Sequence, residues 1–347
     1  MKSEQPKPAP RLSRQTIFLS AMALAGCAVV GCFLLWGDRG KNGHAEAAVS
    51  DLRLEDIPFD GAEAYDYLKQ LCALGPRPSG SQGMQAQQRL LKAHFERFGA
   101  RVEFQPFQVR HPEGEGVVSM ANLIVRWHPE IPERIILCGH YDTLPFPLRD
   151  PDNPRGVFVG ANDNGSGIAV LMALARDMPN VHMTRCGVDF VLFDGEEFIF
   201  NENQRYFLGS EYFARAYAKQ PSPHCRCAVL LDMVGGANLQ IYYERNSMWW
   251  GDTRPMVEQI WATAKRLGVR EFIAQKKHEV RDDHLMLHEI AKIPACDIID
   301  FDYPAWHTQA DTPQQCSALS LAKVGWVLRE WLRKKVTNDE SQMTNHE

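Results

Sequence analysis

The stretch VDFVLFDGEE, residues 188–197, joins a mostly apolar, β-branched run to a short acidic segment. Apolar runs of this length without helical spacing are typical of strands buried on both faces. Similar runs occur at 135–138 (IILC), 227–231 (CAVLL) and 295–299 (ACDII). Segments with helical spacing cover 62–74, 82–98, 165–176, 210–217, 255–267, 283–291 and 319–333. This alternation predicts a three-layer α/β/α sandwich around a mostly parallel, mixed central sheet.

Side chains suited to metal binding follow the predicted strands. In chain order they are His140, Asp142, Asp163, Glu196, Glu197, Asp232 and His307. We expect all of them at strand ends along the carboxyl edge of the sheet, where sites form in such folds. Carboxylate oxygen and imidazole nitrogen are ligands that Zn²⁺ takes, and a catalytic zinc site needs three with one position left open. The set therefore predicts a metal site, whereas one histidine or one acidic pair alone would indicate only a structural or surface feature.

Composition excludes several other classes of protein. With 347 residues, 45% of them hydrophobic and 23% charged, the chain has the composition of a packed globular protein. Its formal net charge of −5 gives no electrostatic reason to expect nucleic acid as a partner. The sequence contains no glycine-rich phosphate loop, no GxSxG elbow and no HExxH motif.

The N-terminal part of the chain contains a long apolar run preceded by basic residues. Residues 16–36 (TIFLSAMALAGCAVVGCFLLW) carry no charge and are long enough to cross a bilayer as a helix. Four basic residues precede them: Lys2, Lys7, Arg11 and Arg14. The basic flank, 1–15, predicts a cytoplasmic N-terminus and an extracytoplasmic domain, and the length of the apolar run favours an uncleaved transmembrane anchor. Two alternatives stay open: a lipoprotein acylated at Cys27, because residues 24–27 (LAGC) resemble a lipobox, and a cleaved, secreted form.

The remaining sequence divides into three parts by composition. Residues 37–50 are small and polar, which is typical of a flexible linker. The alternating strand and helix patterns occupy 51–335, and we expect this segment to be the catalytic domain. Residues 336–347 read as a polar tail.

Five short motifs together resemble those of the zinc-dependent M28 peptidase superfamily. They are HYD (140–142), GANDNGSG (160–167), DGEE (194–197), LLDMVGG (230–236) and WHT (306–308). The superfamily includes aminopeptidases with two zinc ions and animal-type glutaminyl-peptide cyclotransferases, which share the fold and use one. Both branches keep all five ligand positions, so the motifs alone do not separate them. The resemblance implies a zinc aminopeptidase or glutaminyl cyclase-like fold.

Other features favour the cyclase branch. Residues 198–208 separate the Glu pair from the following Gly-Ser, and cyclases carry an insertion of that size. Trp306 and the segment 282–284 (DDH) also match the cyclase pattern. Two features depart from it: Glu202 stands where animal cyclases place a substrate-binding Trp, and GANDNGSG is closer to the aminopeptidase consensus. The resemblance thus implies a cyclotransferase acting on peptide or protein N-termini, with an M28 aminopeptidase as the alternative.

The same resemblance implies roles for individual residues. It assigns zinc to Asp163, Glu197 and His307, with one ion per chain expected and two if the chain is an aminopeptidase. It makes Glu196 the general acid–base catalyst, since a neighbouring carboxylate can bind the metal while Glu196 faces the substrate.

Five further residues complete the predicted site. Asp232 and Asp282 are expected to form an acidic cluster with Glu196 and to share protons with it. Asp282 also suits the simpler role of a helix N-cap. Trp306 is expected to be an aromatic wall for the substrate side chain. His140 and Asp142 are either ligands of a second metal or groups that support the first ligand set.

Overall fold

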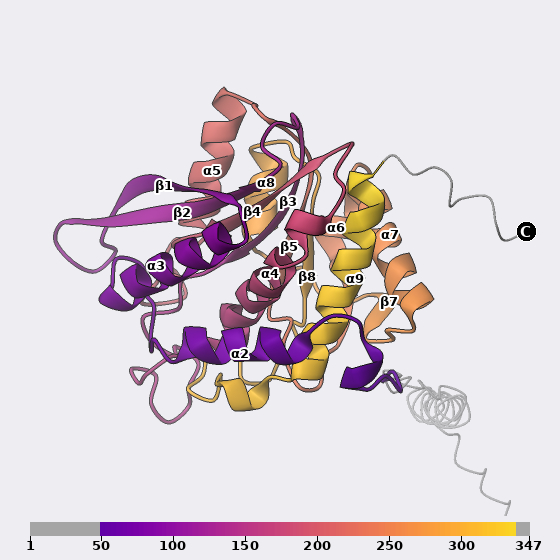
Figure 1. The fold of residues 1–347 in the computed structure, drawn as a ribbon. Helices are drawn as coiled ribbons and strands as arrows, with labels where there is room; N and C mark the ends of the chain where they lie inside the picture. Colours follow the sequence, from indigo (N-terminus) through magenta and orange to yellow (C-terminus); the bar gives the residue numbers. More distant parts are fainter. Residues whose placement is uncertain (1–48, 338–347) are drawn as a thin grey trace, which may run out of the picture. The chain divides into compact units, whose positions relative to one another are not determined.

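The centre of the fold is a six-stranded sheet with the order β1-β2-β4-β3-β5-β8 (Figure 1) in a computed structural model that describes residues 49–337. The strands are β1 (Arg101–Arg110), β2 (Val117–Trp127), β3 (Glu133–His140), β4 (Gly187–Phe193), β5 (His224–Asp232) and β8 (Ala295–Ile299). Strands β4, β3, β5 and β8 run parallel, whereas β1 and β2 form an antiparallel hairpin that joins the sheet along β4. The sheet is therefore mixed and mostly parallel, as predicted.

The central strands are buried on both faces because their side chains alternate between two cores. On β3, Ile135 and Leu137 belong to the larger core, whereas Ile136 and Cys138 belong to the core on the opposite face. This two-sided burial explains why the central strands read as continuous apolar runs rather than as alternating patterns.

Helices cover both faces of the sheet and make the fold three-layered (Figure 1). The larger core is covered by α2 (Gly61–Cys72), α3 (Gln82–Arg97), α4 (Gly167–Ala175), α7 (Arg254–Leu267) and α9 (Ala318–Val336). The opposite core is covered by α5 (Leu208–Lys219) and α8 (Asp283–Glu289). A small parallel sheet of β6 (Ile241–Tyr243) and β7 (Phe272–Lys276) lies outside the main one, and the short helix α6 (Arg245–Trp249) follows β6.

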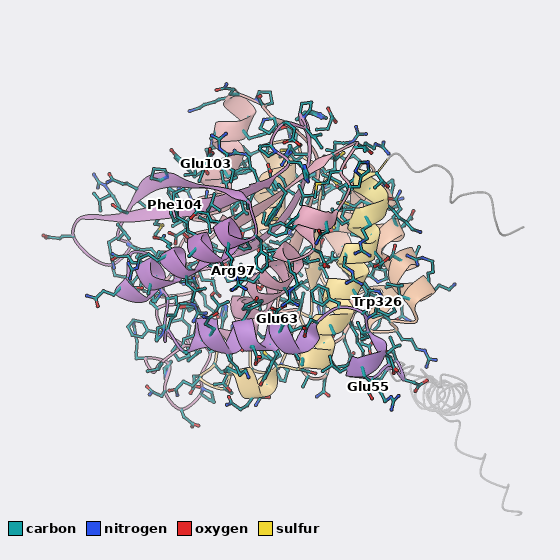
Figure 2. The ribbon with its side chains drawn as sticks, in the orientation of Figure 1. Glu55, Glu63, Arg97, Glu103, Phe104 and Trp326 are labelled. Carbon is teal, nitrogen blue, oxygen red and sulfur yellow. The ribbon has the colours of Figure 1, made fainter. Side chains whose placement is uncertain are left out.

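The β1–β2 hairpin is absent from the strands that the sequence predicts. Along β1 the side chains are mostly exposed or half-buried, and Pro106 interrupts the apolar pattern. Glu103 and Phe104, labelled in Figure 2, lie on this edge strand, and Phe104 keeps 39% of its surface exposed. An edge strand with this much exposed surface lacks the apolar run that identifies a buried strand.

The order of connections identifies the edge of the sheet where a ligand can bind. From β3 the chain passes through α4 on one face to β4, and then through α5 on the opposite face to β5, on the other side of β3. Ligands in open α/β sheets bind outside the carboxyl ends of the strands at such a reversal. His140, the last residue of β3, lies at this point.

Two residues just outside the predicted domain boundaries are packed against the fold. Ser50, expected in the linker, is buried, and both its backbone nitrogen and its hydroxyl donate to Glu271. Val336, expected in the tail, is the buried last residue of α9. No helix within residues 49–337 is long and apolar enough to cross a bilayer, and the predicted anchor at 16–36 lies outside the described residues.

Candidate active site

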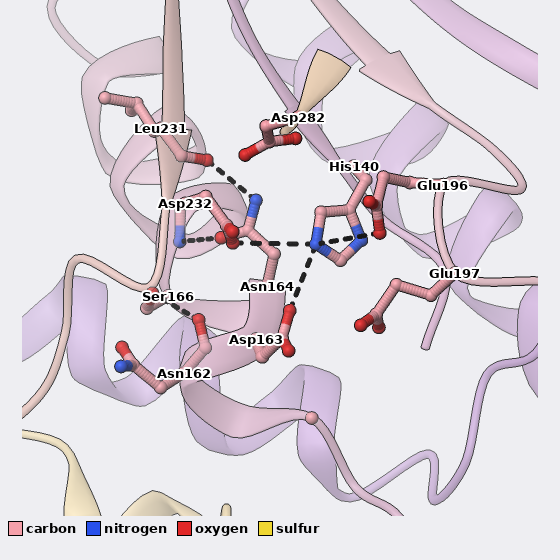
Figure 3. A network of polar contacts seen from close by, with 12 residues as sticks. His140, Asn162, Asp163, Asn164, Ser166, Glu196, Glu197, Leu231, Asp232 and Asp282 are labelled. Carbon is pink, nitrogen blue, oxygen red and sulfur yellow. Dashed lines mark hydrogen bonds and ion pairs between the residues drawn. The ribbon is translucent and has the colours of Figure 1, made fainter. Parts of the chain in front are cut away.

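The predicted site residues converge at the carboxyl edge of the sheet (Figure 3). His140 ends β3, the Glu196–Glu197 pair follows β4, and Asp232 ends β5. His307 lies in the loop after β8. Asp163 differs from the expectation of a strand end: it lies in the segment Ala161–Ser166 that leads into α4, where its own backbone is not helical (φ −105°, ψ 95°). Its carboxylate still lies beside His140 and His307, so the predicted set comes together although Asp163 is not at a strand end.

Three side chains form a group of donors that can hold a metal. The Nε2 atom of His307 lies 2.8 Å from Oε1 of Glu197 and 3.4 Å from Oδ2 of Asp163. All three side chains are buried, and their ligating atoms lie within 4.8 Å of one another. Oδ2 of Asp163 has no hydrogen-bond partner among the described residues. Buried carboxylates facing one imidazole fit Zn²⁺, because a cation offsets their charge and bonds the unpartnered oxygen.

A second group shares Asp163 with the first. Nε2 of His140 lies 3.1 Å from Oδ1 of Asp163 and 3.5 Å from Oδ1 of Asp232. His140, Asp163 and Asp232 also have ligating atoms close enough to hold a metal ion. The two groups therefore meet at a single carboxylate.

Asp142 orients the Glu pair through the main chain. Its two oxygens accept hydrogen bonds from the backbone nitrogens of Glu196 and Glu197, each at 3.1 Å. The backbone nitrogen of Leu144 also donates to Oε2 of Glu197, at 3.1 Å. Of the two sequence-based interpretations of Asp142, the contacts favour support of the ligand set.

Asp311 orients Asp163 and was missed in the sequence. Its carboxylate accepts hydrogen bonds from the backbone nitrogens of Asn162 at 2.8 Å and Asp163 at 3.1 Å, and from the Tyr303 hydroxyl at 2.7 Å. Asp311 lies in the loop that carries His307, far from any strand end. No local pattern distinguishes it from an exposed loop aspartate, although it is fully buried.

Burial sets the protonation of the acidic cluster. Burial raises the pKa of Glu196 and of Asp282 well above the ordinary carboxyl range, and neighbouring carboxylates raise both further. Burial likewise raises the pKa of Asp232. Carboxyl groups this close cannot all be charged, so they share protons and titrate together.

The two histidines differ in their electrostatic surroundings. Burial lowers the pKa of His307 to about 4, which keeps the imidazole in the neutral form that binds metals. Burial also acts to lower the pKa of His140, but the carboxylates around it, led by Glu196, hold that pKa well above its usual value.

The site opens into a cavity of about 350 Å³. Its lining includes the predicted residues Asp163, Glu196, Glu197, Asp232, Asp282, Trp306 and His307. Asp282 is also the N-cap of α8, with its side chain accepting from the backbone nitrogen of Asp283 at 2.6 Å. Tyr206 and Phe207, from the segment 198–208, add aromatic walls. His140 and Asp142 are not among the residues that line the cavity.

The fold and the site together define an α/β metalloenzyme, because a mixed sheet carries buried carboxylates and imidazoles around a cavity at its carboxyl edge. The model of Peptidase family M28 matches residues 122–332, which is more than half of the chain. This protein belongs to peptidase family M28.

The individual relatives include both glutaminyl cyclotransferases and an aminopeptidase. The glutaminyl-peptide cyclotransferase of Bothrops jararaca is 26% identical over 288 residues, which cover 73% of this chain and 76% of the relative. The solved glutaminyl cyclase of Fimbriiglobus ruber is 39% identical, with a TM-score of 0.76, and the match covers 82% of this chain and 97% of that one. A leucine aminopeptidase precursor from Bacteroides thetaiotaomicron is 29% identical, with a TM-score of 0.74. The match covers 82% of this chain and 99% of that one.

Replacing Asp311 is expected to weaken metal binding without touching a metal-binding atom. In Asp311→Asn the amide NH₂ faces the backbone N–H of Asp163, so Asp163 loses the bond that orients it. We expect zinc affinity to fall by about 10–100-fold, as for other groups that orient ligands. Competition with a fluorescent zinc chelator measures this affinity. Tyr303→Phe, which removes only the hydroxyl donor, should have a smaller effect, and an unchanged affinity in Asp311→Asn contradicts the assigned role.

Proposed function

We propose that this protein is a zinc-dependent glutaminyl-peptide cyclotransferase, which converts the N-terminal glutamine of peptides and proteins to pyroglutamate and releases ammonia. The observation that carries the proposal is the position of Asp282, which lines the same cavity as Glu196 and the Asp163, Glu197 and His307 donors. The cavity thus combines a metal-type donor set with a group of carboxyls that can exchange protons. Similarity to a solved glutaminyl cyclase over 97% of that chain supports the same assignment.

The reaction needs one proton to move between two nitrogen atoms. The α-amine of the substrate attacks its own γ-amide carbon, a C–N bond forms, and the bond to the amide nitrogen breaks as ammonia leaves. Glu196 is the candidate to take the proton from the α-amine and to give one to the leaving nitrogen. Burial raises the pKa of Glu196 well above the ordinary carboxyl range, which suits a group that must hold a proton before giving it to the leaving nitrogen. Asp232 and Asp282 support it by keeping shared protons in the cluster.

Asp163, Glu197 and His307 would hold one zinc ion. Bound there, zinc would supply a Lewis acid for the γ-carbonyl oxygen of the substrate. The two oxygens of Asp163 favour a single ion: Oδ1 contacts His140 at 3.1 Å, whereas Oδ2 has no hydrogen-bond partner among the described residues and faces His307. The aromatic wall at Trp306 would then hold the substrate side chain against this donor set.

An M28 aminopeptidase is the second candidate, favoured by the group His140, Asp163 and Asp232, which could hold a second ion. One experiment separates the two. We expect purified, zinc-loaded domain to release ammonia from a Gln-initiated peptide and to release no nitroaniline from Leu-p-nitroanilide. Nitroaniline without ammonia identifies the aminopeptidase instead, and neither product refutes both functions. Chelation followed by zinc addition should abolish and restore the ammonia signal.

Neutralising each member of the Glu pair should separate chemistry from metal binding. Glu196→Gln keeps size and polarity but removes the proton carrier, so turnover should fall by about 10²–10⁴-fold while zinc content stays at the wild-type level. Glu197→Gln should lose zinc, because an amide is a poor zinc ligand. Kinetics and elemental analysis of the same samples measure both effects. The two substitutions are chemically identical and adjacent, so each is the control for the other, and zinc loss in Glu196→Gln contradicts the assignment.

We also propose that residues 16–36 anchor the enzyme and that the catalytic domain, 51–335, acts outside the cytoplasm. The basic flank before the apolar segment supports this orientation. Alkaline phosphatase, which needs an oxidising compartment, is expected to be active when fused after Lys335, and the intact mass should retain residues 1–36. Activity only of a reporter that works in the cytoplasm contradicts the orientation. A mature chain that begins with an acylated Cys27 identifies a lipoprotein, and one that begins after 36 without a lipid identifies a secreted form.

A further inference from the structure

Arg149 lies at the mouth of the cavity and contacts the aromatic wall. Its guanidinium carbon lies 4.0 Å from the ring centroid of Trp306, within the range of a cation–π contact. Trp306 is half-buried, and its other aromatic neighbours are Phe301, at 4.8 Å between ring centroids, and His307, at 4.4 Å. The arginine therefore contacts a ring that the surrounding protein only partly encloses.

Glu202 holds the guanidinium from a second loop. Nε of Arg149 lies 2.7 Å from Oε1 of Glu202, and the two side chains keep 46% and 53% of their surface exposed. An ion pair this exposed adds little to the stability of the fold. It does fix a direction for the guanidinium, because Arg149, Glu202 and Trp306 come from three separate loops that all line the cavity.

The main chain around Arg149 is fixed independently of its side chain. The backbone nitrogen of Arg149 donates to the carbonyl of His307 at 3.0 Å, and Oδ2 of Asp150 accepts from the backbone nitrogen of Gln309 at 2.8 Å. These bonds stabilise the loop where His307 has a left-handed backbone, with a φ of 59°. Neither bond involves the Arg149 side chain, so a substitution of that side chain leaves both in place.

We propose that Arg149 is a positioning residue that fixes the Trp306 ring as a wall of the substrate pocket, with Glu202 holding the guanidinium in place. The proposal rests on the proposed function, in which Trp306 contacts the substrate side chain. A fixed ring is ready to bind, whereas a free ring must be ordered by the substrate at a cost in affinity. The pair therefore acts on substrate binding and leaves proton transfer at Glu196 unchanged.

The kinetic test is a double-mutant cycle with Gln-initiated peptides. Arg149→Ala should raise KM by about 3–10-fold with kcat within about twofold, the scale expected for a partly exposed cation–π contact. Arg149→Lys should restore part of the loss, and Glu202→Gln should give a smaller loss than Arg149→Ala. In a Trp306→Ala background, Arg149→Ala should have no further effect.

Arg155 offers a matched control for the arginine. It is an exposed arginine on the same stretch of chain, and its guanidinium carbon lies 4.8 Å from the ring centroid of Phe146, yet neither residue lines the cavity. Arg155→Ala should leave KM unchanged. If Arg149→Ala raises KM equally in the wild-type and Trp306→Ala backgrounds, the proposal is overturned, since Arg149 then contacts the substrate directly. An unchanged KM in Arg149→Ala also overturns it.

A second readout does not depend on any activity. In protein labelled with 5-fluorotryptophan, the ¹⁹F signal of Trp306 can be assigned by its absence in Trp306→Phe. Arg149→Ala and Glu202→Ala should shift or broaden this signal, whereas Arg155→Ala should not. An unmoved signal overturns the ring contact itself. If wild-type protein releases no ammonia while the signal responds as expected, the proposed function fails and the positioning contact stands.

Discussion

The site depends on one constraint: several carboxylates are buried beside two imidazoles. They lie at the edge of a sheet that is itself buried on both faces. Unpaired buried charges are strongly unfavourable. Three features of the structure offset this cost. Asp142 and Asp311 accept main-chain hydrogen bonds that orient the other carboxylates, and the cluster around Glu196 shares protons. The Asp163, Glu197 and His307 donors fit a cation. The same arrangement supplies a fixed donor set and a proton carrier within one cavity.

The fold was largely predictable because strands that are buried on both faces have continuous apolar sequences. The four parallel strands read as continuous apolar runs, and each predicted run lies within an observed strand. All of the predicted helices occur, with ends shifted by a few residues. The edge strand β1 was not predictable in this way, because Phe104 and most of its neighbours stay exposed or half-buried and form no apolar run. Its partner β2 does contain a short buried apolar run, residues 123–125, which is not among the predicted strands.

The site was predictable where a functional side chain directly follows a strand or belongs to a motif. His140, Glu197 and Asp232 are of this kind, and the structure brings them together with Asp163 and His307. The residues that orient this set were harder to find. Asp311 and Arg149 lie in irregular loops, and they act through contacts between loops that only the tertiary structure makes adjacent. Local patterns record burial and periodicity but not which loops meet.

Anomalous diffraction at the zinc edge, on crystals of the zinc-loaded protein, shows which of the buried donors bind zinc and how many ions they hold. Asp163 belongs to two groups of donors that could each hold a metal, and we expect only the group with Glu197 and His307 to be filled. We expect one anomalous peak, bonded to Asp163, Glu197 and His307 at about 2.0–2.2 Å, as for zinc with oxygen and nitrogen ligands. A peak bonded to His140 and Asp232, alone or beside the first, contradicts a single zinc ion held by Asp163, Glu197 and His307.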